Sequence, residues 1–121
     1  MIIDKLTYID VLWPKKDLIL ENVLNNNSIV CKLNYKNISA LFTGDIEEVA
    51  EKKIVSLYGS KILNSTFFKV AHHGSKTSSI QDFVSMVNPK IALIGVGENN
   101  KFGHPNDMVI ERLQICRGSC I

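Results

Sequence analysis

Residues 29–45 read Ile-Val-Cys-Lys-Leu-Asn-Tyr-Lys-Asn-Ile-Ser-Ala-Leu-Phe-Thr-Gly-Asp and contain two strand-like runs joined by a polar turn. Residues 29–33 alternate between apolar and polar side chains, which is typical of a strand with one buried face. Residues 34–37 have the composition of a hairpin turn, and residues 38–43 are the expected partner strand. The sequence therefore predicts a β-hairpin that ends at Gly44 and Asp45.

The segments on either side of this hairpin show strand and helix patterns in turn. Upstream, residues 8–13 predict a strand that Pro14 ends, and residues 25–28 predict a turn or loop. Downstream, the expected elements are a helix from Gly44-Asp45 to Gly59, a strand over 66–70, a short helix capped by Ser78 or Ser79 and stopped by Asn88-Pro89, a fully buried strand over 90–96, a loop over 97–103 and a last helix with Pro105 in its first turn. This alternation predicts a layered α/β fold.

Length and composition indicate one globular domain. The chain has 121 residues, of which 45% are hydrophobic, so a sizeable core is possible. The net charge of +2 comes from scattered lysines and arginines and gives no basis for inferring nucleic-acid or membrane binding. No signal-peptide pattern is present, and the longest apolar run, residues 91–96, is too short to span a bilayer. We therefore expect a soluble, cytoplasmic chain, or the soluble domain of a membrane protein if the sequence is a fragment.

The three cysteines do not suggest a disulfide framework or a four-cysteine zinc site. They lie at positions 31, 116 and 120, and no C-x-x-C pair occurs. Cys31 falls inside the hairpin and is expected to be a small buried hydrophobe.

Three residues that could carry chemistry each follow a different expected core strand. Asp45, His73 and His104 stand beside glycines, with spacings of 28 (73 − 45) and 31 (104 − 73) residues. Each spacing matches one strand–helix unit, and the carboxyl ends of strands in α/β sheets gather ligand sites. We therefore expect these three side chains to converge. Asp45 has two compatible interpretations, as a helix N-cap or as a carboxylate metal ligand at a strand end.

The adjacent pair His72-His73 begins a polar loop. Neighbouring side chains leave the backbone in different directions, so the two rarely ligate the same ion. One would be a ligand, and the other a group that supports it, contacts substrate or donates a proton. The residues that follow, Gly74 to Ser79, are rich in N–H and hydroxyl donors and suit an anion such as phosphate, although a plain polar turn is the alternative.

Other catalytic patterns are missing from the sequence. Ser75 lacks the G-x-S-x-G context of a hydrolase nucleophile, and neither a Walker A motif nor a G-x-G-x-x-G motif occurs. Catalytic zinc requires three protein ligands, whereas these residues supply Asp45 and one or two histidines. The sequence thus contains part of a metal site.

Four motifs in order resemble a known family. They are Asn-Asn-Asn-Ser-Ile-Val at 25–30, Leu-Phe-Thr-Gly-Asp at 41–45, Lys-Val-Ala-His-His-Gly-Ser at 69–75 and Val-Gly-Glu-Asn-Asn-Lys-Phe-Gly-His-Pro at 96–105. Together they are similar to the metallo-β-lactamase-fold domain of ComEC-type DNA-uptake competence proteins and to related metallohydrolases. The resemblance covers roughly residues 8–113.

The resemblance implies an αββα sandwich with two divalent ions, zinc or manganese, at one edge of its sheets. It implies that Asp45 bridges the metals and that His73 is a terminal ligand. His72 would face substrate and His104 would line the cleft, both as catalytic residues. Phosphate-binding residues would be Ser75 and Lys76, with Asn27 approaching from a neighbouring loop. The implied reaction is phosphodiester hydrolysis of DNA by metal-activated hydroxide, in proteins whose relatives are fused to membrane domains.

One departure from the family pattern affects the whole interpretation. The H-x-H-x-D-H motif that supplies most metal ligands is absent and would lie before Met1. Residues 1–121 are therefore expected to be a single partial domain, the C-terminal half of the sandwich, with residues 114–121 as an unassigned tail. A second chain could supply the missing half. The alternatives are a non-catalytic module that binds phosphate or a partner, or a truncated remnant whose sheet face, left uncovered, favours aggregation.

Overall fold

The strands follow one another across a single sheet in the same order as along the chain. A computed structural model describes residues 1–115 and 119–120 of the chain. The strands are β1 (Thr7–Trp13), β2 (Val30–Tyr35), β3 (Ile38–Phe42), β4 (Phe67–Lys69), β5 (Ile91–Leu93) and β6 (Ser119–Cys120). The first three are antiparallel, and β3 to β6 are parallel. The predicted hairpin and the predicted α/β class are confirmed.

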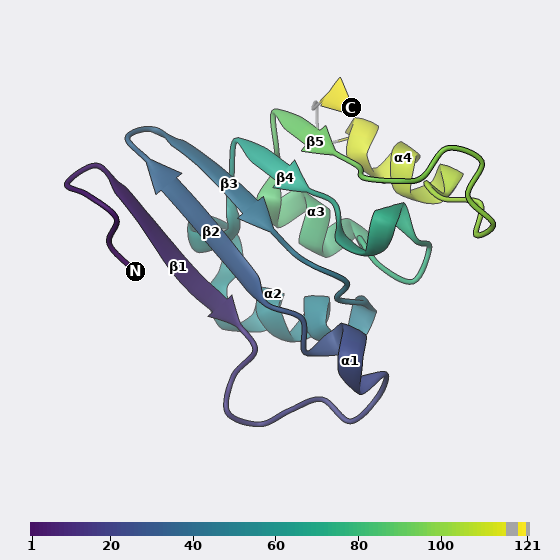
Figure 1. Cartoon of the computed structure of the whole chain (residues 1–121), viewed down its shortest axis with the longest axis horizontal. Helices are drawn as coiled ribbons and strands as arrows, with labels where there is room; N and C mark the ends of the chain where they lie inside the picture. Colours follow the sequence, from purple (N-terminus) through teal and green to yellow (C-terminus); the bar gives the residue numbers. More distant parts are fainter. Residues whose placement is uncertain (116–118, 121) are drawn as a thin grey trace.

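The long helices lie on one side of this sheet. The helices are α1 (Val23–Asn26), α2 (Glu48–Leu63), α3 (Gln81–Val87) and α4 (Asp107–Ile115), with a 3₁₀ turn, η1, at Ala71–Gly74. Figure 1 shows α2 and α3 behind the sheet, while the face turned to the viewer carries no helix. The core therefore forms between the sheet and the helices, from Val30, Leu41, Phe68 and Ala92 of the strands and Ala50, Ile54, Val84, Val87 and Leu113 of the helices.

The other face of the sheet is also largely apolar, with Lys69 as the charged member of its rows, and we call it the open face. Cross-strand partners point to the same side, and the register aligns its members in two rows across β1 to β5. One row is Val11, Cys31, Phe42, Lys69 and Leu93, and the other is Ile9, Leu33, Ala40, Phe67 and Ile91. Val11 is 59% exposed and Leu93 is 38% exposed. An apolar surface of this kind is typical of a face that another element covers.

The helix after the hairpin begins later than predicted. Its N-cap is Glu47, not Asp45, and the Glu47 side chain makes no capping hydrogen bond to the first turn of the helix. Gly44, with a φ of +54°, turns the chain first, and a Cβ there would lie 2.8 Å from Cβ of Ser28. Asp45 therefore lies before the helix begins, so its interpretation as an N-cap is wrong. Gly59, at a φ of +67°, breaks the helical conformation as predicted, but one more helical turn follows it.

The cap of α3 comes from a distant residue instead of Ser78 or Ser79. The buried carboxylate of Glu51 in α2 accepts hydrogen bonds from the N–H groups of Ser79 (2.6 Å) and Ile80 (3.1 Å). Arg112 donates to the carbonyl oxygen of Ser79 at 3.0 Å. Burial raises the pKa of Glu51 to about 7, although both N–H bonds and the nearby Arg112 act in the opposite direction. One carboxylate thus joins the two helices.

Several smaller predictions need correction. Helix α1 covers the first half of the predicted turn at 25–28, and β5 is shorter than the predicted strand at 90–96, with only Ala92 of its residues fully buried. Helix α4 starts two residues after Pro105. Cys31 is half-buried on the open face rather than fully buried. In the predicted tail, residues 114–115 belong to α4 and 119–120 form β6, while 116–118 and 121 lie outside the described residues.

Across the part of the chain that the structure describes, no helix combines the length and the apolar character needed to cross a membrane.

Candidate functional site

Three loops meet at the carboxyl ends of the parallel strands. Asp45 follows β3, His72 and His73 follow β4, and His104 lies beyond β5. The His72 ring lies 6.5 Å from the His73 ring and 6.2 Å from the His104 ring, between centroids. Asp45 Oδ1 approaches His73 Nε2 to 4.0 Å, and His73 and His104 line one cavity. The three side chains therefore lie together as predicted, because parallel strands bring their carboxyl ends to one edge.

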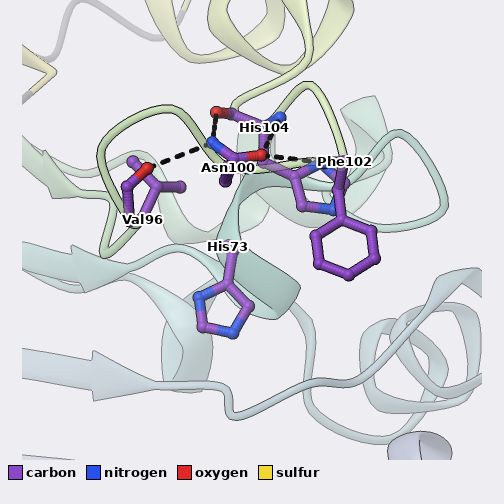
Figure 2. A pocket seen from close by; sticks show the side chains of 6 residues that line it. His73, Val96, Asn100, Phe102 and His104 are labelled. Atoms are coloured by element: carbon purple, nitrogen blue, oxygen red, sulfur yellow. Dashed lines mark hydrogen bonds between the residues drawn. The ribbon is translucent and has the colours of Figure 1, made fainter.

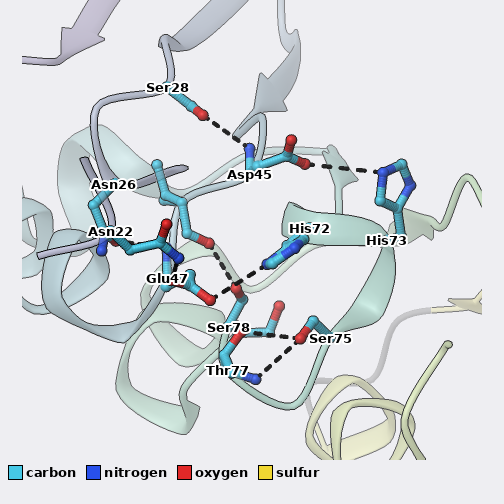
Figure 3. A network of polar contacts seen from close by, with 12 residues as sticks. Asn22, Asn26, Ser28, Asp45, Glu47, His72, His73, Ser75, Thr77 and Ser78 are labelled. Atoms are coloured by element: carbon cyan, nitrogen blue, oxygen red, sulfur yellow. Dashed lines mark hydrogen bonds and ion pairs between the residues drawn. The ribbon is translucent and has the colours of Figure 1, made fainter. Parts of the chain in front are cut away.

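Asp45 and His73 form the pair best placed to bind a cation. Asp45 Oδ1 lies 4.0 Å from His73 Nε2, and both side chains are about half exposed (Figure 3). His73 Nδ1 is 2.6 Å from the carbonyl oxygen of Gly95. Because a carbonyl oxygen only accepts, Nδ1 carries the hydrogen, and in the neutral ring Nε2 keeps its lone pair for a ligand. Such backbone partners are the usual orienting contacts of metal-bound histidines.

The two neighbouring histidines diverge because the backbone turns at both of them. His72 and His73 have φ values of +51° and +57°, in the left-handed region that non-glycine residues rarely adopt. Conformations of this kind cost about 1–3 kcal/mol each and cluster at functional sites. The His72 N–H donates to the carbonyl oxygen of Gly44 at 2.9 Å, which ties the turn to the Asp45 loop. The strained turn therefore aims one imidazole at Asp45 and the other elsewhere.

The second imidazole meets a carboxylate that the sequence patterns did not single out. His72 Nδ1 lies 3.5 Å from Glu47 Oε2. Glu47 is held in turn by Asn26, whose side-chain oxygen accepts from its N–H at 2.9 Å, and by the side-chain amide of Asn22 (Figure 3). Glu47 lies within the helix that the sequence predicts from Gly44-Asp45 to Gly59, and in the structure it is the N-cap of α2. Its one distinguishing signal is its position two residues after Asp45, next to the glycine turn.

The predicted phosphate-binding residues occupy different environments. Ser75 is buried, and its hydroxyl oxygen lies 2.9 Å from that of Thr77, whereas Lys76 is exposed. The side chain of Asn27 bonds the backbone of Ile19 and Val23 and so fastens its own loop. Asn27 is thus not brought to the Asp45–Glu47 segment, and its phosphate role stays a prediction, as do those of Ser75 and Lys76.

The neighbours of Asn27 do reach that segment. Asn26 contacts Glu47, and Ser28 Oγ accepts from the N–H of Asp45 at 3.3 Å. The loop that contains Asn27 therefore supports the site through the residues on either side of it.

His104 lines a cavity of about 170 Å³ beside His73. Figure 2 shows this cavity, which Val96, Gly97, Asn100 and Phe102 complete. Burial, followed by the nearby His72 and His73, lowers the pKa of His104, so its ring tends to be neutral near pH 7. A neutral imidazole has one donor and one acceptor nitrogen and suits contact with a polar ligand.

The site as described supplies two candidate ligands to a cation. Within residues 1–115 and 119–120, no group of three or more histidine, cysteine, aspartate or glutamate side chains is arranged to hold a metal ion. Asp45 and His73 nevertheless fit two positions of one coordination shell, since their ligand atoms face one another and His73 is already oriented. Oxygen and imidazole ligands suit zinc and manganese alike.

Comparison with known proteins finds similar chains in several bacteria, and three of these relatives are described here. The chain is 34% identical over 90 residues to ComE operon protein 3 of Bacillus subtilis, 40% identical over 91 residues to the uncharacterized protein YcaI of Escherichia coli, and 33% identical over 90 residues to competence protein ComA of Neisseria gonorrhoeae. These matches cover 74%, 75% and 74% of this chain, but only 11%, 12% and 13% of the respective relatives. No protein-family model matches the chain. The chain therefore has homologues named for competence and corresponds to about a tenth of their length.

Proposed function

We propose that this chain is the C-terminal half of a metallo-β-lactamase-fold domain that acts in DNA uptake during competence, and that the completed domain hydrolyses phosphodiester bonds with the help of divalent metal ions. The observation that carries the proposal is the Asp45–His73 pair, with ligand atoms 4.0 Å apart where strand ends meet. The names of the competence relatives support the biological setting.

The open face supports the assignment of half a sandwich. In an αββα sandwich two sheets pack face to face, and each carries helices on its outer side. Here helices cover one face of the sheet, and the apolar rows from Val11 to Leu93 and from Ile9 to Ile91 lie on the other. A second sheet would bury those rows, and its loops would approach Asp45 and His73 at the common edge.

Each residue of the site has a place in this proposal. Asp45 and His73 would hold metal, with the Gly95 carbonyl oxygen fixing the His73 ring. Bound divalent ions supply hydroxide near neutral pH and stabilise the negative charge that develops on a phosphate. His72 would contact substrate, because Glu47 lies beside its Nδ1 and limits how the ring can turn. His104 would face the nucleic-acid strand from the opposite wall of the site.

Metal binding can be tested on the chain itself. Addition of Mn²⁺ should broaden the NMR signals of the His73 ring before those of His104, because paramagnetic broadening falls steeply with distance. Asp45→Ala and His73→Ala should each abolish this selective broadening, whereas Asp17→Ala, at a distant exposed carboxylate, should not. Broadening that both site variants retain would show that the ligands are assigned wrongly.

Activity is tested after the missing half is supplied. A fluorescent DNA oligonucleotide should be cleaved in Mn²⁺ when the chain is mixed with a polypeptide that carries the H-x-H-x-D-H half of a relative, and Asp45→Ala should prevent cleavage. Cleavage at the same rate with Asp45→Ala would contradict the proposed hydrolysis.

A further inference from the structure

The cavity beside His73 has the size of a single ring. Its volume is about 170 Å³, and His73 and His104 form part of its wall. A cavity of about 150 Å³ in another protein binds benzene, whereas sites for drug-sized ligands measure about 300–1,000 Å³. The cavity therefore accommodates one six-membered ring, and a larger ring system would project from its mouth.

An exposed aromatic side chain stands at this cavity. Phe102 is 78% exposed and forms part of the wall of the cavity. One face of the ring is stacked on His104, with centroids 5.6 Å apart and planes inclined by 17°. The stack leaves the remaining surface of Phe102 free for a second planar group.

The loop that carries Phe102 is held in shape by one amide side chain. Asn100 Oδ1 accepts from the N–H groups of Phe102 (3.2 Å) and His104 (3.0 Å). Its Nδ2 donates to the carbonyl oxygens of Gly97 (3.3 Å) and His104 (2.6 Å), as Figure 2 shows. Asn100 is thus committed to its own loop. It fixes the backbone of the loop at Phe102, and such preorganisation lowers the entropy lost when a ligand binds.

We propose that this cavity, the ring pocket, binds one nucleobase of a single-stranded nucleic acid whose phosphate lies at Asp45 and His73. The proposal rests on the proposed function, which brings a phosphodiester to those residues, and it names what occupies the neighbouring space. Proteins that hold single strands stack successive bases on aromatic side chains, and this stacking tolerates any sequence because every base has a π-face. Lys101, exposed and adjacent to Phe102, is available to the strand's phosphates.

The chemistry of the pocket favours a pyrimidine but does not read the base sequence. The cavity volume of about 170 Å³ is close to that of a cavity that binds benzene, so we expect it to hold a one-ring base more completely than a purine. The Asn100 amide has no free donor or acceptor geometry for a base edge, since four backbone contacts already engage it. We therefore expect a modest preference for thymine and cytosine and weak discrimination between them.

The test measures binding of a fluorescent ten-nucleotide oligothymidylate to the full chain by anisotropy, with EDTA present so that neither metal nor cleavage contributes. Phe102→Ala should weaken binding by about 5-fold to 100-fold, which is the range found for loss of one base-stacking ring. Phe102→Tyr should bind within about 2-fold of the unaltered chain, because the stacking face remains. Leu20→Ala, at another exposed apolar residue, should bind normally.

An oligonucleotide of the same length with abasic sites separates stacking from charge. Its binding should be weak, and Phe102→Ala should not weaken it further. The ring pocket would be overturned if Phe102→Ala left oligothymidylate binding unchanged, or if the unaltered chain did not bind oligothymidylate. Displacement by an aromatic dipeptide but not by thymidine monophosphate would overturn it in favour of a peptide ligand.

The ring pocket and the proposed hydrolysis can fail separately. Asp45→Ala tests the metal site by its loss of Mn²⁺ binding, whereas Phe102→Ala tests the ring pocket by its loss of oligothymidylate binding in EDTA. Suppose that Phe102→Ala weakens oligonucleotide binding, but that neither Asp45→Ala nor His73→Ala changes Mn²⁺ binding. This result would support the ring pocket and contradict the metal site. The reverse pattern would retain the metal site and reject the pocket.

Discussion

The helix-covered face and the open face of the sheet are built from alternate residues of the same strands, yet only one of them is buried. In β4, Phe68 is fully buried beneath the helices, whereas its neighbour Phe67 points to the open face and is half-buried. In β5, Ala92 is buried while Leu93 is exposed. Strands that are apolar on both sides are typical of sheets covered on both faces. In the described residues, helices cover only one face of a sheet whose strands have this two-sided apolar composition.

The largest expected effect on stability comes from replacing each of the two phenylalanines of β4 with alanine. Phe68→Ala should destabilise the chain by about 3–5 kcal/mol, because it opens a cavity in a packed core. Phe67→Ala should cost about 1 kcal/mol or less, as for residues that are not packed. Urea unfolding followed by circular dichroism measures both. Similar losses for the two variants would break the comparison and show that the open face is covered in solution.

A pH dependence should come from the helix layer, where Glu51 is buried. Its pKa is raised from 4.5 to about 7, so the folded chain binds the proton more tightly than the unfolded chain. Its contribution is fully present below pH 4.5, is lost as the pH rises toward 7, and amounts to roughly 3 kcal/mol. Urea midpoints at pH 5 and pH 8 measure this loss.

Glu51→Gln removes the titrating group and provides the control. The amide should reduce stability at pH 5, since only one of its polar atoms can accept from the N–H groups of Ser79 and Ile80. The difference between pH 5 and pH 8 should shrink in this variant. An unchanged difference would assign the pH dependence to other groups.

A smaller effect on stability is expected at two glycines, Gly74 in a loop of the site and Gly59 in the helix layer. Gly74 has a φ of +79°, and a Cβ there would lie 2.8 Å from Cβ of Pro105, so Gly74→Ala should cost about 2 kcal/mol. Gly59 has a similar φ of +67° but nothing within 4 Å, so Gly59→Ala should cost about 1 kcal/mol from the backbone alone. Thermal unfolding compares the pair. Equal losses would mean that the contact with Pro105 does not constrain the loop.

The smallest effect on stability should come from charges placed on the open face. Val11→Lys and Leu93→Lys should change the free energy of unfolding by less than about 0.5 kcal/mol, because both side chains are already exposed. They should nevertheless reduce self-association, since charge interrupts an apolar patch. Sedimentation velocity measures the monomer fraction. A charge that instead destabilises the chain strongly would show that copies of the chain cover this face.

Much of the fold could be predicted from local patterns. The hairpin followed from alternation around a polar turn, and the α/β order followed from strand and helix periods in sequence. The convergence of Asp45, His73 and His104 followed from glycines at strand ends, because parallel strands share a carboxyl edge. These features depend on short segments, and the structure confirms them.

What local patterns missed depends on contacts between distant segments. The start of α2 depends on the Gly44 turn packing against Ser28, sixteen residues earlier (44 − 28). The cap of α3 comes from Glu51, 28 residues before Ser79 (79 − 51), so no local motif marks it. Glu47 contacts His72, which is 25 residues away (72 − 47), so no local pattern marks it as part of the site. Such contacts are decided by the assembled fold, which outweighs local propensity.

The order of the strands has a consequence for how the chain is made. Because the sheet order equals the sequence order, every strand pairs with the one synthesised just before it. A single domain of this size generally folds as a unit. Asp45, His73 and His104 therefore leave the ribosome in that order but come together at their common edge in one cooperative step.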